Sequence, residues 1–224
     1  MIVVASGEGP SDLGDGYGGV DCYGPVAYLL QQLGLPLCPQ AEWRWASKQE
    51  LKGNSRTLLP GKKSKPGGAH FRANALGLAN LAKQLEPPHC AILFRDSDST
   101  RSSPRNQWDE QWRSFEVGFA EADYHNWIGV LPRPKSEAWL LCGMQKQSYQ
   151  NCAKLEDLPG NDASPKALKR MLAEAARKRG IGTTAAQLSE WVCQNPELAA
   201  KINMPSWQKT RERVAEVLKR LNPS

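Results

Sequence analysis

The chain has 224 residues, of which 40% are hydrophobic, and its 29 Lys and Arg outnumber its 23 Asp and Glu to give a net charge of +6. No apolar run approaches the roughly 18–20 residues of a membrane span, so we predict a globular cytoplasmic protein with no membrane association. Residues 1–43 hold five acids and no Lys or Arg, whereas residues 44–72 hold eight bases and one acid. This split predicts a polyanionic partner that meets a site rich in carboxylates.

The first half of the chain alternates short apolar runs with helical patterns. Residues 2–5 form a β-branched run that predicts a buried strand, and residues 23–33 carry a helical apolar stripe. Residues 39–68 form a basic insert that is rich in Trp, Gly and Pro and only weakly periodic. Further strands are predicted at residues 90–94 and 127–131, with helices at residues 69–85 and 107–122.

The second half of the chain has mainly helical patterns. We predict helices at residues 136–144, 165–179, 185–193 and 207–221, the second with its N-cap at Ser164 and its end at Gly180. Alternating strands and helices favour an α/β fold with a doubly wound, mainly parallel sheet flanked by helices. We therefore divide the chain into a core at residues 1–145, which contains the insert, and a helical C-terminal extension at residues 146–224 that packs on it.

Six cysteines are scattered along the sequence. They form no CxxC pair and have no neighbouring His at zinc-finger spacing. They are therefore expected to be reduced packing residues, as is usual in the cytoplasm.

Carboxylates follow the predicted strands. Glu8 lies between glycines after the first strand, and Asp96 and Asp98 follow the second. Two carboxylates at alternate positions suit Mg²⁺ or Mn²⁺, which prefer oxygen ligands. The alternatives are an ordinary glycine turn around Glu8 and a capped turn at the Asp pair.

The third predicted strand is followed by Arg133-Pro-Lys135-Ser-Glu137. Glu137 would add a carboxylate, and Lys135 or Arg133 would neutralise a phosphate. Because ligands of parallel sheets bind at the carboxyl ends of the strands, we expect all four acids on one edge.

The basic insert and its borders supply candidate nucleic-acid contacts. Its bases would track a phosphate backbone, while Trp43 and Trp45 would stack on unpaired bases. A solvated loop or a docking surface for an acidic protein is the alternative. The predicted contacts are Arg44, Lys62, Lys63, Lys65 and Arg72.

These motifs together resemble a known family. A strand followed by Glu8-Gly-Pro-Ser-Asp12, a strand followed by Asp96-Ser-Asp98, and Glu137-Ala-Trp-Leu-Leu141 resemble Toprim-like proteins of the RloB and OLD type. Leu158-Pro159, Ser164-Pro165-Lys166 and Pro205-Ser206-Trp207 also resemble later motifs of that family. Such proteins accompany AAA- or ABC-type ATPases in bacterial antiphage or abortive-infection systems.

The resemblance implies a metal-dependent nuclease that hydrolyses DNA or RNA phosphodiester bonds as the effector subunit beside its ATPase partner. Glu8 would be a general acid/base or a metal ligand, Asp96 and Asp98 the metal-binding pair, and Glu137 an auxiliary acid. The predicted catalytic residues are Glu8, Asp96, Asp98 and Lys135. Asp12 stands where the family more often has Glu. The implied ligands of Mg²⁺ or Mn²⁺ are Glu8, Asp12, Asp96, Asp98 and Glu137.

Two other functions remain open. In the first, the site is catalytically degenerate and the protein is a nucleic-acid-binding or regulatory subunit. Alternatively, Asp96-Ser-Asp98-Ser-Thr100 resembles the nucleophile motif of haloacid-dehalogenase-type phosphatases, in which Asp96 would form an aspartyl-phosphate.

Overall fold

The computed structural model of the whole chain describes residues 1–9, 12–14, 23–55, 69–85, 89–98, 106–145 and 152–222. Four strands form a parallel sheet with the order β2-β1-β3-β4. The strands are β1 (Ile2–Ser6), β2 (Glu42–Trp45), β3 (His89–Phe94) and β4 (Trp127–Val130). The prediction of an α/β fold with a parallel sheet flanked by helices is confirmed.

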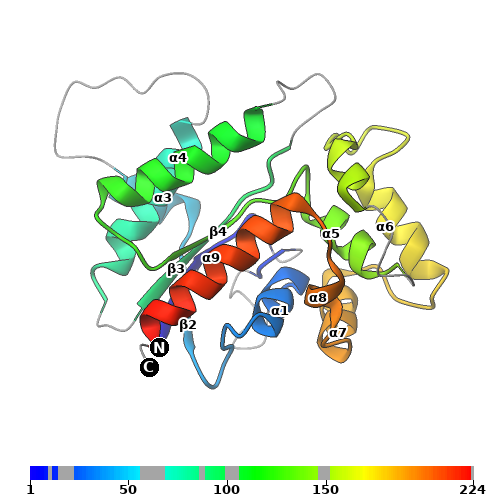
Figure 1. Cartoon of the computed structure of the whole chain (residues 1–224), viewed down its shortest axis with the longest axis horizontal. Coiled ribbons are helices and arrows are strands. Elements are labelled where there is room, and N and C mark those ends of the chain that lie inside the picture. Colours follow the sequence, from blue (N-terminus) through cyan, green and yellow to red (C-terminus); the bar gives the residue numbers. More distant parts are fainter. Residues whose placement is uncertain are drawn as a thin grey trace.

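Helices cover both faces of the sheet (Figure 1). One face carries α2 (Lys48–Asn54), α3 (Ala69–Ala82) and α4 (Gln107–Glu121), and the other carries α1 (Pro25–Gln32) and α9 (Pro205–Leu221). A smaller helical group contains α5 (Ser136–Gly143), the 3-10 helix η1 (Cys152–Asp157), α6 (Leu168–Arg177), α7 (Ala185–Gln194) and α8 (Leu198–Lys201).

Alternation along the strands builds a core on each side of the sheet. Val3 and Ala5 of β1 face the core shared with α1 and α9, whereas Val4 faces the core shared with α3 and α4. Strands buried on both faces read as continuous apolar runs, which is why β1, β3 and β4 were predictable.

Helices α3 and α4 pack very closely at Gly118. A Cβ built there would lie 2.4 Å from the carbonyl oxygen of Arg72 and 2.7 Å from the Ala75 Cβ. Only a residue without a side chain permits this approach, so α4 can lie directly on α3.

The basic insert contains regular structure that the sequence did not indicate. Residues 42–45 form β2 and residues 48–54 form α2, whose start is held by a capping box between Ser47 and Glu50. Trp43 and Trp45 of β2 are half-buried against the core, and the Trp43 Nε1–H donates to the Pro36 carbonyl at 3.1 Å. The stacking of these indoles on unpaired bases stays a prediction.

Two further details correct the sequence-based expectations. Helix α6 begins at Leu168 with Ala167 at its N-cap, so the predicted cap at Ser164 is wrong, whereas Gly180 does follow the helix with a φ of 68°. Cys142 and Cys152 form a disulfide, so the expectation of six reduced cysteines is wrong for this pair.

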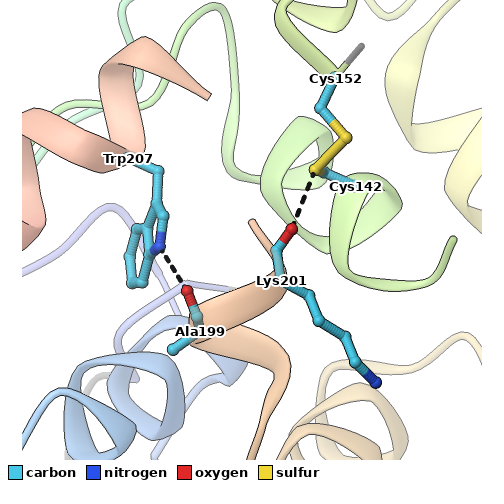
Figure 2. The surroundings of a disulfide bond; sticks show 5 residues. All are labelled: Cys142, Cys152, Ala199, Lys201 and Trp207. Carbon is cyan, nitrogen blue, oxygen red and sulfur yellow. Dashed lines mark hydrogen bonds between the residues drawn. A yellow bond between two sulfur atoms is a disulfide. The ribbon is translucent and has the colours of Figure 1, made fainter. Parts of the chain in front are cut away.

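The disulfide joins the end of α5 to the start of η1 (Figure 2). Beside it, the Cys142 Sγ lies 3.9 Å from the Lys201 carbonyl oxygen, and the Trp207 Nε1–H donates to the Ala199 carbonyl at 2.9 Å. Helices α5, α8 and α9 therefore meet at this point. Among the described helices, none is long and apolar enough to cross a membrane.

Candidate active site

The strand order reverses between β1 and β3. Strand β2 pairs with one edge of β1, and β3 pairs with the other edge of β1. In the second pair, Ser6 lies opposite Leu93. Ligands of doubly wound sheets bind where the strand order reverses, outside the carboxyl ends of the strands. Glu8 and Asp96 follow β1 and β3 at this point, as the sequence predicted.

The segments that follow β3 and β4 continue to pair beyond the sheet. The backbone N–H groups of Arg95, Ser97 and Asp98 donate to the carbonyls of Val130, Pro132 and Pro134 at 3.0, 3.3 and 3.1 Å. This pairing holds the Asp pair beside the turn that starts α5.

Asp96 is the electrostatic centre of the site. Its side chain is half-buried, and burial raises its pKa well above the ordinary value. Repulsion from four other carboxylates raises the pKa further, in the order Asp12, Glu137, Glu8 and Asp98. The structure thus brings the other four predicted acids within electrostatic reach of Asp96.

Ser136, the first residue of α5, joins two of these acids. Its Oγ–H donates to Asp12 Oδ1 at 2.7 Å, and its backbone N–H donates to Asp96 Oδ1 at 3.2 Å. The N-terminal N–H groups of a helix have no intrahelical partner and favour negative charge. Ser136 was not among the predicted site residues, although a hydroxyl at a predicted helix start was a signal.

Arg95 directly precedes Asp96 and was also missed. Only 3% of it is exposed, and its guanidinium donates to the carbonyls of Ser6, Gly7 and Phe94 at 3.3, 3.3 and 2.6 Å. Burial lowers its pKa to about 10, while the charge of Glu8 opposes this shift. Arg95 therefore joins the ends of β1 and β3, and its positive charge acts on Glu8.

Glu8 follows the end of β1 and lies among the charged side chains of the site. It is exposed as a residue, yet partial burial of its carboxyl group is the largest cause of a raised pKa. The charge of Arg95 lowers this pKa, Asp98 raises it, and Lys48 and Lys135 lower it. Lys48, at the start of α2, thus belongs to the surroundings of the site.

Lys135 lies where the sequence placed it. Its Nζ is 3.6 Å from Asp98 Oδ1 and 3.1 Å from Asp162 Oδ1. Burial alone would lower its pKa, but the hydrogen bond and charge of Asp162, together with the charges of Asp98 and Asp96, raise it. Lys135 therefore stays positively charged at the edge of the cluster.

Glu137 contributes a carboxylate with an unused oxygen. Its Oε2 is buried and has no hydrogen-bond partner in the described part of the chain. The residue lines a cavity of about 190 Å³ between α5, α6 and α7, together with Ser136, Leu140 and Lys169. Because a buried acceptor without a partner costs about 1–3 kcal/mol, this oxygen favours a bound donor or cation.

The donor set has the chemistry that a hard divalent cation prefers, since it consists of carboxylate oxygens in mutual repulsion. Within the described ranges, however, no three His, Cys, Asp or Glu side chains lie in a group that could hold a metal ion. The residues fit Mg²⁺ or Mn²⁺ by chemical type, and their side chains would have to draw together around the ion.

The predicted nucleic-acid contacts do not form a cluster as the acids do in the described part of the chain. Arg44 is half-buried on β2, and the Arg72 guanidinium is paired with the carboxylate of Glu121. Lys62, Lys63 and Lys65 lie outside the described residues.

Comparison of the chain with models of known protein families, with curated proteins and with solved structures finds no match. The assignment of a function therefore depends on the chemistry of the site.

Proposed function

We propose that the protein is a metal-dependent nuclease of Toprim type that hydrolyses phosphodiester bonds of DNA or RNA. The observation that carries this proposal is the gathering of carboxylates at the carboxyl ends of β1 and β3, where Ser136 donates to both Asp12 and Asp96 and Lys135 lies 3.6 Å from Asp98. So concentrated a negative charge favours a cation, and Asp12, Asp96, Asp98, Glu137 and Glu8 are the candidate ligands.

A bound Mg²⁺ or Mn²⁺ would supply charge neutralisation at the phosphate that is attacked. Glu8, with its raised pKa, is suited to accept a proton from the attacking water. Lys135 would pair with a non-bridging oxygen of the phosphate. Ser136 would position Asp96 and Asp12, because it donates a hydrogen bond to each. Arg95 would position the acids through the backbone, because its guanidinium donates to the Ser6 carbonyl at the end of β1.

The resemblance to RloB- and OLD-type proteins supports a wider setting. In that setting the nuclease is a cytoplasmic effector subunit beside an ATPase of the AAA or ABC type, in a bacterial antiphage system. The role of the basic insert as a nucleic-acid contact is part of the same proposal.

The test uses three Asp→Asn substitutions that keep shape and remove charge. Asp98 has a φ of 46° and the control Asp123 has a φ of 48°, a conformation that Asn tolerates at both positions. Asp123 lies in the turn between α4 and β4, away from the acid cluster. We expect Asp96→Asn and Asp98→Asn each to lower Mg²⁺-dependent cleavage about 100-fold or more, and Asp123→Asn to leave it within about twofold.

Plasmid, single-stranded DNA and tRNA serve as substrates with Mg²⁺, Mn²⁺ or Ca²⁺. The same proteins are heated with and without Mg²⁺, and only those with intact Asp96 and Asp98 should gain thermal stability from the ion. Cleavage that persists in both variants rejects the proposal. Binding without cleavage under every metal favours the degenerate subunit, and an aspartyl-phosphate trapped at Asp96 favours the phosphatase.

A further inference from the structure

Helix α6 and its flanks carry a basic surface that the sequence analysis did not single out. Residues 166–179 contain six bases and one acid, and all six bases are exposed. The single acid, Glu174, pairs with Lys178 at 2.7 Å. The bases without an ion pair in the described part of the chain are Lys166, Lys169, Arg170, Arg177 and Arg179.

The spacing of these bases gives the surface a direction. Arg170 and Arg177 are seven residues apart and lie on nearly the same side of the helix, with Lys169 about a quarter-turn away on the flank. Seven residues span about 10.5 Å along a helix axis, and successive phosphates of one DNA strand rise about 3.4 Å. The stripe is therefore long enough to contact several consecutive phosphates.

The opposite side of α6 is already occupied. Leu168, Leu172 and Ala176 are buried in the core. A helix that binds a membrane surface needs a free apolar face to insert, and α6 has none. A polyanion that binds through charge alone is the partner that suits this surface.

The basic surface leads to the acid cluster. Lys169 and Ala173 of α6 line the cavity whose other wall contains Ser136 and Glu137 of α5. Asp162, in the segment before α6, holds the Nζ of Lys135 at 3.1 Å. Figure 1 shows α6 beside α5 at one side of the molecule.

We infer that the basic face of α6 is the docking surface for the phosphate backbone of a nucleic acid, and that it leads one strand to the acid cluster. The inference rests on the proposed function, because it names the surface that presents the substrate to the same site. It places the main backbone contact on α6 and not in the basic insert.

The test measures binding separately from cleavage. All proteins carry Asp96→Asn and are kept in EDTA, and fluorescent single-stranded DNA, double-stranded DNA and RNA are the ligands. The α6 variant is Lys169→Gln/Arg170→Gln/Arg177→Gln. Its matched control on α9 is Lys209→Gln/Arg211→Gln/Lys219→Gln, which removes the same charge from another surface. A third protein carries Lys62→Gln/Lys63→Gln/Lys65→Gln.

We expect the α6 variant to bind at least one of the nucleic acids about 10- to 100-fold more weakly. The slope of log Kd against log salt between about 50 and 200 mM should fall by about 2–3, since each lost phosphate contact removes about 0.9. The α9 control should stay within about threefold. Because Lys169, Arg170 and Arg177 are exposed, circular dichroism and thermal unfolding of the α6 variant should show unchanged folding.

Three results would overturn the inference: unchanged binding by the α6 variant, equal losses in the α6 and α9 variants, or a loss confined to the insert variant. Binding that depends on α6 in a protein that never cleaves with any metal would keep the docking surface and reject the nuclease. The two proposals therefore fail separately.

Discussion

At the scale of single residues, Glu156 in η1 is a buried acid outside the candidate site. Only 5% of it is exposed, and its Oε1 accepts the Ser206 N–H at 2.8 Å. The Ser206 Oγ in turn accepts the Trp139 Nε1–H at 2.8 Å. Burial raises the pKa of Glu156, while the hydrogen bonds from Ser206 and the charge of Arg133 oppose the shift.

This raised pKa makes the stability of the protein depend on pH. Between the ordinary pKa of a glutamic acid and the raised pKa of Glu156, the folded state retains a proton that the unfolded state has lost. Stability from this residue is therefore present at low pH and is lost as the pH rises through the folded-state pKa. Glu156→Gln keeps the acceptor oxygen without the charge, so it should stabilise the protein at pH 7 and have little effect near pH 4.

Chemical denaturation of both proteins between about pH 4 and pH 8 measures this difference. The gain should be about 1.4 kcal/mol for each unit by which the pKa is raised. Glu174→Gln is the matched control, since the hydrogen bond and charge of Lys178 lower the pKa of this fully exposed acid. A Glu156→Gln protein whose advantage does not grow with pH would show that burial of this carboxyl group has no such effect.

The candidate site was predictable in its acids but not in the residues that hold them. Glu8, Asp96 and Asp98 follow apolar strands directly, so a parallel sheet is sufficient to bring them to one edge. Ser136 and Asp12 are 124 residues apart, and their hydrogen bond depends on the turn after β4. No local pattern in the sequence encodes such a contact, and the same is true of the buried guanidinium of Arg95.

At the scale of elements, the disulfide between Cys142 and Cys152 covalently links α5 to η1. Cys142 and Cys152 enclose a separation of 10 residues, and closing such a loop in the unfolded chain is worth about 2–3 kcal/mol. Helix α5 begins with Ser136 and Glu137 of the site, so the disulfide acts on an element that positions the acids.

Reduction should therefore destabilise the protein by about 2–3 kcal/mol, measured by urea denaturation with and without dithiothreitol. Cys142→Ser/Cys152→Ser should be less stable by a similar amount and insensitive to the reductant. Cys193→Ser is the control, because Cys193 is an exposed free thiol in the described structure. If wild-type stability does not change on reduction, the two cysteines are thiols in solution, as the sequence analysis expected.

The missed elements share a physical cause. Strand β2 has the sequence Glu-Trp-Arg-Trp and lies at the edge of the sheet, with exposed or half-buried residues only. Its alternation is short and polar, so it gave a weaker signal than the continuous apolar runs of β1 and β3. Helix α2 is similarly polar, and only the capping box at Ser47 and Glu50 marked its start.

At the scale of the whole molecule, the C-terminal helices share a core with the sheet. Helix α9 packs along β4, where the Thr210 Oγ–H donates to the Gly129 carbonyl at 3.3 Å. Trp207 is fully buried, and its ring centre lies 4.9 Å from that of Trp139. The same cluster of buried residues contains Val3 and Ile92 of the sheet.

Because this core is continuous, we expect the sheet and the C-terminal helices to unfold together. Trp207→Ala removes a buried aromatic side chain and should cost about 3–5 kcal/mol, a large part of the roughly 5–15 kcal/mol of a typical domain. Hydrogen exchange should then accelerate in β3 as much as in α9. Val117→Ala, at an exposed position of α4, should change stability by less than about 0.5 kcal/mol. Faster exchange confined to residues 152–222 would instead mean that the C-terminal helices unfold as an independent unit. In that case the sheet would stay folded while α6 separates from the acid cluster.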